Sequence, residues 1–369
     1  MPEKFSYFFD SEKFALPFDA KWIGSLSILS GGQVQTTMIH SRDGVIHISP
    51  ALSRETNENE AIICSRWIHP KKGLLTANQQ NLAKSDIVTI PKVKVVGDVR
   101  PRNGVSYPFW LEEEVEGKLL NQVVLEGKPT LGIYRKLVKW MAEFHSPTEG
   151  KTSLKANYNC RLGSIESILK NDEELRNCLG PQRIEAINRL LILAKQNIAS
   201  SIDENELVDK IHGDLRGNNV MINEKSVSVI DFEQGLFGGD WYYDLEKLLL
   251  IEKHDQPDVN KPYMYFPNLS QKQKYSLVKT YSKERAARGW ELPTIMQNYL
   301  KSHDPIAFES RRQLYDIENA LSIMIFRHLM GWDFGISPDG SNRRGVNFIA
   351  DLVIQNYNHL IFQKNNETE

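Results

Sequence analysis

The order of apolar and polar residues divides the chain into a strand-rich first third and a mostly helical remainder. Apolar residues alternate with polar ones over 36–48, on both sides of an Asp43-Gly44 pair, which is typical of a β-hairpin with a tight turn. Apolar runs at 87–96 and 107–111 predict more strand. These runs together predict a small antiparallel sheet.

Helical spacing of apolar residues begins after a polar start at 57–60, where we expect one helix. In the last two thirds of the chain, two longer stripes recur every three or four residues. One runs over 184–198, behind a Gly180-Pro181 start, and the other over 314–325. We expect both to be core helices, and no apolar run approaches the roughly 20 residues that a membrane helix needs.

Composition narrows the class of protein. The 369 residues are 41% hydrophobic and 25% charged, which is typical of a globular chain long enough for two lobes. The net charge of -2 offers no bulk attraction for nucleic acid or an anionic membrane, and the start has no signal-peptide pattern. Three scattered cysteines, Cys64, Cys160 and Cys178, encode neither a disulfide framework nor a zinc site. We therefore expect a cytoplasmic protein that binds neither nucleic acid nor membrane.

One segment concentrates candidate chemistry. Residues 211–222 read Ile-His-Gly-Asp-Leu-Arg-Gly-Asn-Asn-Val-Met-Ile, and an Ile-Asp-Phe triplet follows at 230–232. Two short apolar runs here predict a hairpin, which brings together the oxygen-bearing side chains of Asp214, Asn219 and Asp231. Such hard ligands suit Mg²⁺, which binds one or two carboxylates together with phosphate oxygens and water.

These motifs resemble the catalytic and metal motifs of the aminoglycoside phosphotransferase and choline kinase superfamily, small-molecule relatives of protein kinases. The resemblance covers most of residues 24–250 and implies an α+β, bilobal, protein-kinase-like fold. It implies a small β-rich lobe over 1–117 and a larger, mainly helical lobe over 118–369, with nucleotide between them. Three flanking segments agree with the family in the same order: Glu116-Gly117, Met141-Ala-Glu-Phe-His145 and Gly239-Asp-Trp-Tyr-Tyr-Asp-Leu245.

The resemblance also implies a role for each residue of the motif. Asp214 would be the catalytic base that orients and deprotonates the acceptor hydroxyl, while Asn219 and Asp231 would hold Mg²⁺ on the nucleotide phosphates. His212 and Asp244 would support the catalytic loop. For His212, we expect a hydrogen bond that holds the loop and not proton transfer.

The nucleotide site is implied by two other segments. Gly31 and Gly32 lie where the family has a phosphate-covering loop, although two glycines also fit a plain hairpin turn. The main chain near Glu113 to Val115 would pair with the nucleobase. ATP or GTP would be the co-substrate.

One departure from the family concerns a cation. The third strand of such kinases usually ends in a Lys or Arg that holds phosphates and pairs with a helix Glu. Alignment places Ser49 at this position, with Glu60 or Glu58 as the helix acid. Three alternatives follow: His47, Arg54 or Arg42 replaces the cation, the nucleotide is held differently, or the protein binds nucleotide without catalysis.

The favoured interpretation is a Mg²⁺-dependent kinase that phosphorylates a hydroxyl of a small molecule, an aminoglycoside-like antibiotic or a hydroxylated metabolite. The alternative is a catalytically weak or inactive nucleotide-binding pseudokinase or scaffold. The missing strand cation supports this alternative, whereas the presence of Asp214, Asn219 and Asp231 together argues against it. Acidic residues after the metal motif, Glu233 and Asp240 among them, predict a cation-selecting acceptor pocket, or else form a solvated surface.

Overall fold

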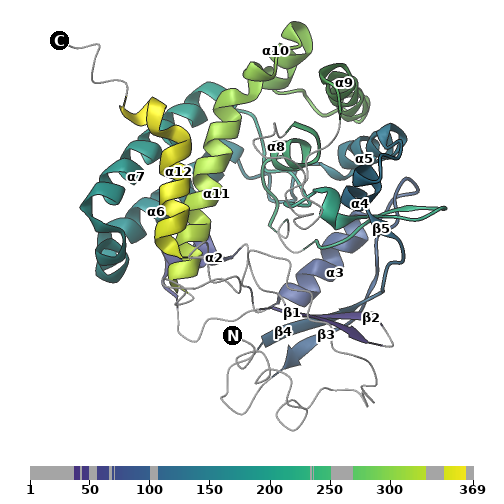
Figure 1. Cartoon of the computed structure of the whole chain (residues 1–369), viewed down its shortest axis with the longest axis horizontal. Coiled ribbons are helices and arrows are strands. Elements are labelled where there is room, and N and C mark those ends of the chain that lie inside the picture. Colours follow the sequence, from purple (N-terminus) through teal and green to yellow (C-terminus); the bar gives the residue numbers. More distant parts are fainter. Residues whose placement is uncertain are drawn as a thin grey trace. The chain divides into compact units, whose positions relative to one another are not determined.

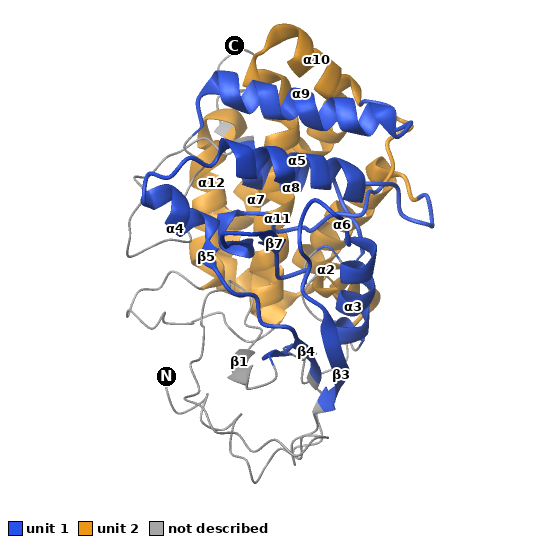
Figure 2. Ribbon diagram, turned by 90° about the vertical axis from the view of Figure 1, so that its right-hand side faces the viewer, with its two compact units in different colours: residues 1–53, 66–151, 208–292 blue, residues 54–65, 152–207, 293–369 orange. Residues whose placement is uncertain are grey.

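The computed structural model describes residues 37–41, 44–49, 56–65, 69, 71–99, 107–232, 235, 237–250, 269–329 and 345–362 (Figure 1). The chain forms two compact units, each made of several segments (Figure 2). Unit 1 comprises residues 1–53, 66–151 and 208–292, and unit 2 comprises residues 54–65, 152–207 and 293–369. The predicted lobe boundary at residue 117 divides the chain differently and stays a prediction.

The first sheet of unit 1 has four antiparallel strands in the order β1-β2-β4-β3. Strands β1 (Thr37–Ser41) and β2 (Gly44–Ile48) confirm the predicted hairpin, and β4 (Tyr107–Glu112) confirms the strand at 107–111. The prediction for 87–96 was half right, because β3 spans Val93–Val99. Thr89 instead makes an isolated parallel bridge to Ser228.

Helix α3 (Lys72–Leu82) packs against β3 and β4. Gly73 allows the close approach, because a Cβ there would lie 2.9 Å from the carbonyl oxygen of Phe109. The buried face of α3 is polar, formed by Lys72, Thr76, Gln79 and Gln80. A helix with this kind of face has no apolar stripe, so its sequence gave no periodic signal.

The second sheet of unit 1 carries the predicted hairpin. Its strands β5 (Lys118–Leu119), β6 (Val220–Ile222) and β7 (Val227–Val229) lie in the order β5-β6-β7. The side chain of Asn223 closes the β6-β7 turn by accepting the N–H groups of Lys225 and Ser226. The other elements of the unit are α4 (Leu120–Leu125), α5 (Leu131–Phe144), the 3₁₀ turn η1 (Gly217–Asn219), α8 (Tyr242–Leu245), the π-helical turn η2 (Glu246–Leu250) and α9 (Gln271–Ala287).

Unit 2 is helical in its described residues. The two predicted stripes lie in α7 (Glu173–Ser201) and α11 (Glu309–Leu329), which pack against each other. Gly180 interrupts α7 with a φ of 76°, so the helix restarts at Pro181, as the sequence predicts. The other elements are α2 (Glu58–Cys64), α6 (Leu154–Asn171), α10 (Thr294–Ser302), η4 (Pro305–Phe308) and α12 (Val346–Phe362). Nowhere in the described ranges is a helix both long enough and apolar enough to span a membrane.

Candidate active site

The loop at 212–215 is held by one buried carboxylate. Asp244, on α8, is 0% exposed and accepts backbone N–H groups from His212 at 2.6 Å, Gly213 at 2.9 Å and Leu215 at 3.4 Å. Burial opposes ionisation of Asp244, but the hydrogen bond from His145 and the loop N–H groups outweigh it and lower its pKa. The charged carboxylate therefore fixes the backbone of the loop.

A second layer fixes Asp244 itself. His145 lies at the end of α5, and its Nε2–H donates to Asp244 Oδ2 at 3.0 Å, while its Nδ1 accepts the hydroxyl of Tyr281 at 2.8 Å. Arg285, one turn along α9, donates to Tyr281 Oη at 3.2 Å and to Asp209 Oδ2 at 2.8 Å. All five side chains are buried. This chain of bonds ties α5, α8 and α9 to the loop.

Asp214 sits in an ionic network. Its Oδ2 accepts Arg216 Nε and Nη2 at 2.9 and 2.6 Å and Asn219 Nδ2 at 3.1 Å, and its Oδ1 accepts Lys247 Nζ at 2.7 Å. Burial opposes ionisation, but the two cations prevail and lower the pKa of Asp214 to about 2. Sequence reasoning missed Lys247, because 33 residues separate it from Asp214 and only the fold brings η2 to the loop.

Asn219 and Asp231 lie at the same end of the β6-β7 hairpin. The N–H of Ile230 donates to the carbonyl of Asn219 at 3.0 Å, which places Asp231 one residue beyond that contact. Asn219 Nδ2 donates to the carbonyl of Asp214 at 2.8 Å, so its Oδ1 is directed away from that bond. Asp231 has a φ of 66°, in the left-handed region, which costs of the order of 1 kcal/mol and persists only where surrounding structure holds it.

Asn219 and Asp231 are suitable ligands for a magnesium ion. One carboxylate and one amide oxygen leave room for the phosphate oxygens and water that Mg²⁺ prefers. Within the described part of the chain, no group of three or more His, Cys, Asp or Glu side chains is arranged to hold a metal by itself. A metal here would thus depend on the nucleotide for its remaining ligands.

His212 is buried beneath the loop. Its Nε2–H donates to the carbonyl of Ile230 at 2.8 Å, and its Nδ1 accepts the N–H of Asp214 at 3.3 Å. Burial lowers the pKa of His212, and the nearby Asp244 only partly opposes this effect. A neutral ring that bonds to both ends of the motif suits the supporting role predicted for it.

The remaining predicted residues are not all brought to this loop. Glu113 and Val115 follow β4, where the N–H of Glu113 donates to the carbonyl of Lys92 at 3.0 Å. Asp240 is buried and accepts the N–H of Tyr242, the first residue of α8, at 3.0 Å. Gly31, Gly32, Glu233, Arg42 and Arg54 lie outside the described residues.

Glu60 has a local role in the structure. It belongs to unit 2, where it forms the capping box of α2: its Oε2 accepts the N–H of Asn57 at 3.1 Å. Helix α3 packs against the first sheet of unit 1. The pairing predicted for Glu60 stays a prediction.

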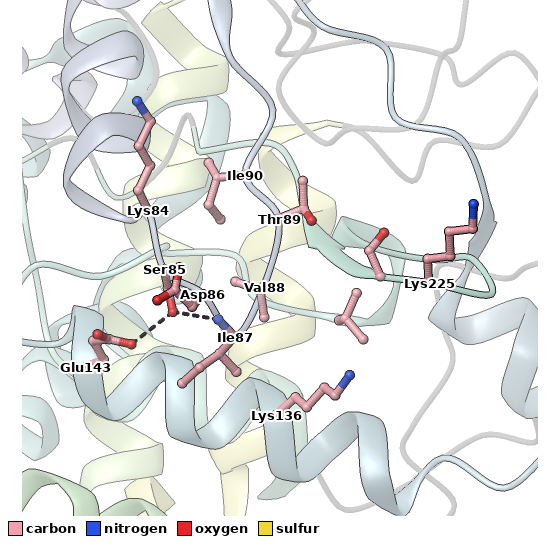
Figure 3. Close-up of a pocket in the computed structure, with 12 residues that line it drawn as sticks. Lys84, Ser85, Asp86, Ile87, Val88, Thr89, Ile90, Lys136, Glu143 and Lys225 are labelled. Carbon is pink, nitrogen blue, oxygen red and sulfur yellow. Dashed lines mark hydrogen bonds between the residues drawn. The ribbon is translucent and has the colours of Figure 1, made fainter.

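Unit 1 also has an open pocket of about 670 Å³ (Figure 3). It is lined by 84–90, Lys136, Glu143 and 225–227, and Ser85 Oγ donates to Glu143 Oε2 at 2.9 Å on its wall. Among the described residues, none of those predicted for catalysis, metal or nucleotide lines it. The pocket is therefore separate from the candidate active site.

Comparison with known proteins identifies the fold. No protein-family model matches the chain, and no curated protein matches its sequence. Among solved structures, the GDP complex of wild-type aminoglycoside 2'-phosphotransferase-IIIa is 14% identical with a TM-score of 0.51, covering 96% of this chain and 98% of that one. The GDP complex of a point mutant of that enzyme is 13% identical with a TM-score of 0.52, over 98% and 99% of the two chains. These likenesses confirm the predicted α+β kinase-like fold: the chain has the fold of the aminoglycoside phosphotransferases.

Proposed function

We propose that this chain is a Mg²⁺-dependent phosphotransferase that moves the terminal phosphoryl group of ATP or GTP to a hydroxyl of a small molecule. The observation that carries the proposal is the arrangement at one end of the β6-β7 hairpin. Asn219 contacts Asp214 there, and Asp231 lies one residue beyond the backbone bond between Ile230 and Asn219, which supports the roles that phosphoryl transfer needs. A buried scaffold that ends at Asp244 holds them.

Asp214 would act chiefly by orienting the acceptor. A carboxylate with a pKa of about 2 is a weak base, so it takes little of the hydroxyl proton before the phosphoryl group is transferred. Its value lies in holding the hydroxyl in line with the phosphorus, since positioning alone can supply a large part of the barrier reduction. To reach Asp214, the hydroxyl would replace one of its present partners, Arg216 or Lys247.

Asn219 and Asp231 would hold Mg²⁺ against the phosphates, where the metal neutralises charge that develops on the transferred group. The backbone of 113–115 would contact the nucleobase. Aminoglycoside 2'-phosphotransferase-IIIa was solved with GDP, which supports a nucleotide co-substrate here. The acceptor we propose is a small hydroxylated compound, without a choice between amino sugar and neutral metabolite.

A pseudokinase is the second candidate, and one observation favours it. The described residues of β2 and the position after it, 44–49, contain no Lys or Arg. The complete catalytic and metal set argues against a purely structural role. A pseudokinase would bind nucleotide without transferring phosphate.

The test is transfer of labelled phosphate from ATP and from GTP, with and without Mg²⁺, to a panel of amino sugars, neutral sugars and nucleosides. We expect Mg²⁺-dependent labelling of at least one acceptor by the wild-type chain and none by Asp214→Asn. Nucleotide binding without any transfer across the panel would support the pseudokinase. Transfer that survives unchanged in Asp214→Asn would refute the assignment of this loop.

A further inference from the structure

Strand β2 carries His47, one of the candidate replacements for the cation that is missing at Ser49. His47 lies opposite Trp110 in the β2-β4 register, and the two rings stack with centroids 4.9 Å apart and planes 5° apart. Both side chains are buried. Because residues 44–49 provide no Lys or Arg, a permanent positive charge on this face of the sheet must come from another element.

Helix α3 brings a lysine to the same face. Lys72 is 1% exposed, and its Nζ lies 5.9 Å from the centroid of the Trp110 ring. The close packing of Gly73 on Phe109 and Trp110 holds this end of α3 against β4. The ammonium group of Lys72 therefore lies over the ring of Trp110, on the strand that neighbours β2.

Two buried polar groups beside Lys72 have no hydrogen-bond partner. Thr76, one turn further along α3, is 1% exposed, and its Oγ1 makes no hydrogen bond in the structure. Trp110 is 0% exposed, and its indole Nε1 likewise makes no hydrogen bond to the described residues. An indole N–H can only donate, and leaving such a group buried and unpaired is unfavourable. Lys72, Thr76 and Trp110 form what we call the donor cluster, which suits an anion.

The same helix links the donor cluster to the catalytic loop. Gln79 Nε2 donates to the carbonyl of Ile211 at 2.9 Å and to that of Gly235 at 3.2 Å. Ile211 directly precedes the His212 loop, and Gly235 follows Asp231. Gln79 is about 10 Å along the helix from Lys72, at 1.5 Å per residue. One rigid helix thus fixes the cluster relative to the loop that carries Asp214.

We propose that the donor cluster binds the phosphates of the nucleotide, with Lys72 of α3 taking the place of the strand cation. This inference rests on the proposed function and makes it more specific. The lysine supplies the charge, and the Thr76 hydroxyl and Trp110 N–H fill their hydrogen bonds with phosphate oxygens. Binding of this kind needs no Lys or Arg on β2 and removes the argument for a pseudokinase.

The experiment is calorimetric binding of ADP and of adenosine, without Mg²⁺, to the full chain. Lys72→Met removes the charge and keeps an unbranched apolar side chain in the buried position. We expect the Kd for ADP to rise about 10- to 100-fold, as for loss of a hydrogen bond to a charged group, with no change for adenosine. The matched control is Lys71→Met, at the exposed neighbouring position, for which both affinities stay within twofold.

Thr76→Val provides a second test that needs only a small change of shape, in case Lys72→Met does not fold. Loss of the hydroxyl should weaken ADP about 3- to 10-fold and leave adenosine unchanged. ADP binding at wild-type strength in Lys72→Met, or in Thr76→Val if only that variant folds, would overturn the donor cluster. Equal weakening of ADP and adenosine would also overturn it, because the effect would then come from the fold. If the donor cluster is overturned but the wild-type chain transfers phosphate, the proposed function still holds. A wild-type chain that neither binds nucleotide nor transfers phosphate refutes both the donor cluster and the proposed function.

Discussion

Replacing Asp244 by Asn tests whether one carboxylate organises the catalytic loop. The carboxylate accepts three backbone N–H groups and the Nε2–H of His145, and every one of these groups is buried. Asn has nearly the same shape but only one acceptor oxygen. The substitution therefore changes hydrogen bonding and charge while it leaves packing almost unaltered.

The expected loss of stability in Asp244→Asn follows from the hydrogen bonds that the amide cannot make. If the Asn oxygen keeps the N–H groups of Gly213 and Leu215, its NH₂ group faces the two donors that bonded Oδ2, the N–H of His212 and Nε2 of His145. The imidazole of His145 can change tautomer and accept from the amide, whereas the N–H of His212 is left buried and unpaired. That loss costs about 1–3 kcal/mol, and loss of charge weakens the remaining bonds by about 1 kcal/mol. We expect Asp244→Asn to lower the free energy of unfolding by about 3 kcal/mol, a large share of the roughly 5–15 kcal/mol typical of a domain.

Urea unfolding followed by tryptophan fluorescence measures this loss, because Trp110, Trp140 and Trp241 all lie in unit 1. The control is Asp351→Asn, which removes an exposed ion pair with Arg183 and should cost less than about 1 kcal/mol. A loss for Asp244→Asn no larger than that of the control would refute the reasoning. It would mean that the loop holds its shape without the carboxylate.

Asp214→Asn should leave the unfolding midpoint within a few degrees of wild type and lower kcat by several orders of magnitude, measured by phosphate transfer. Asp231→Ala should abolish the extra thermal stabilisation that Mg²⁺ adds to bound ADP, and Asn219→Ala should weaken it less, because only the first change removes a charged ligand; a full Mg²⁺ shift in Asp231→Ala would contradict the metal site. Lys247→Met should raise nucleotide hydrolysis in the absence of an acceptor several-fold, because it frees one oxygen of Asp214 for water; an unchanged hydrolysis rate would show that this contact does not restrain Asp214. Unfolded His212 binds a proton near its usual pKa of 6.5 while the buried ring resists it, so the free energy of unfolding should fall as pH drops below about 6.5, more steeply than in His212→Gln; parallel pH curves for the two proteins would argue against this.

The elements that sequence predicted are those with a clear period or a distinctive motif. The β1-β2 hairpin follows from Asp43-Gly44 between alternating residues, and the β6-β7 hairpin follows from two short apolar runs around a polar turn. Helices α7 and α11 follow from their apolar stripes. In each case the local pattern and the tertiary environment agree, so the pattern alone is informative.

The parts that sequence did not predict depend on contacts between distant segments. Helix α3 buries Lys72, Thr76 and Gln79, which read as surface residues in a sequence, and only the sheet makes that face an interior one. Lys247 reaches Asp214 through a π-helical turn that has no signature in composition. Buried polar faces of this kind contradict the usual apolar pattern, and they coincide here with the candidate site.

The ion pairs of Asp214 would limit the hydrolysis of bound nucleotide by water. A carboxylate beside the terminal phosphate of a nucleotide will orient a water molecule as readily as an alcohol. The nucleotide is then hydrolysed without phosphorylation of an acceptor. In this structure Arg216 and Lys247 occupy both carboxylate oxygens, so a stray water gains little by approaching. An acceptor that brings several contacts of its own can displace one cation, whereas water brings none. The ion pairs around Asp214 would thus keep idle nucleotide consumption slow until the proper alcohol is bound.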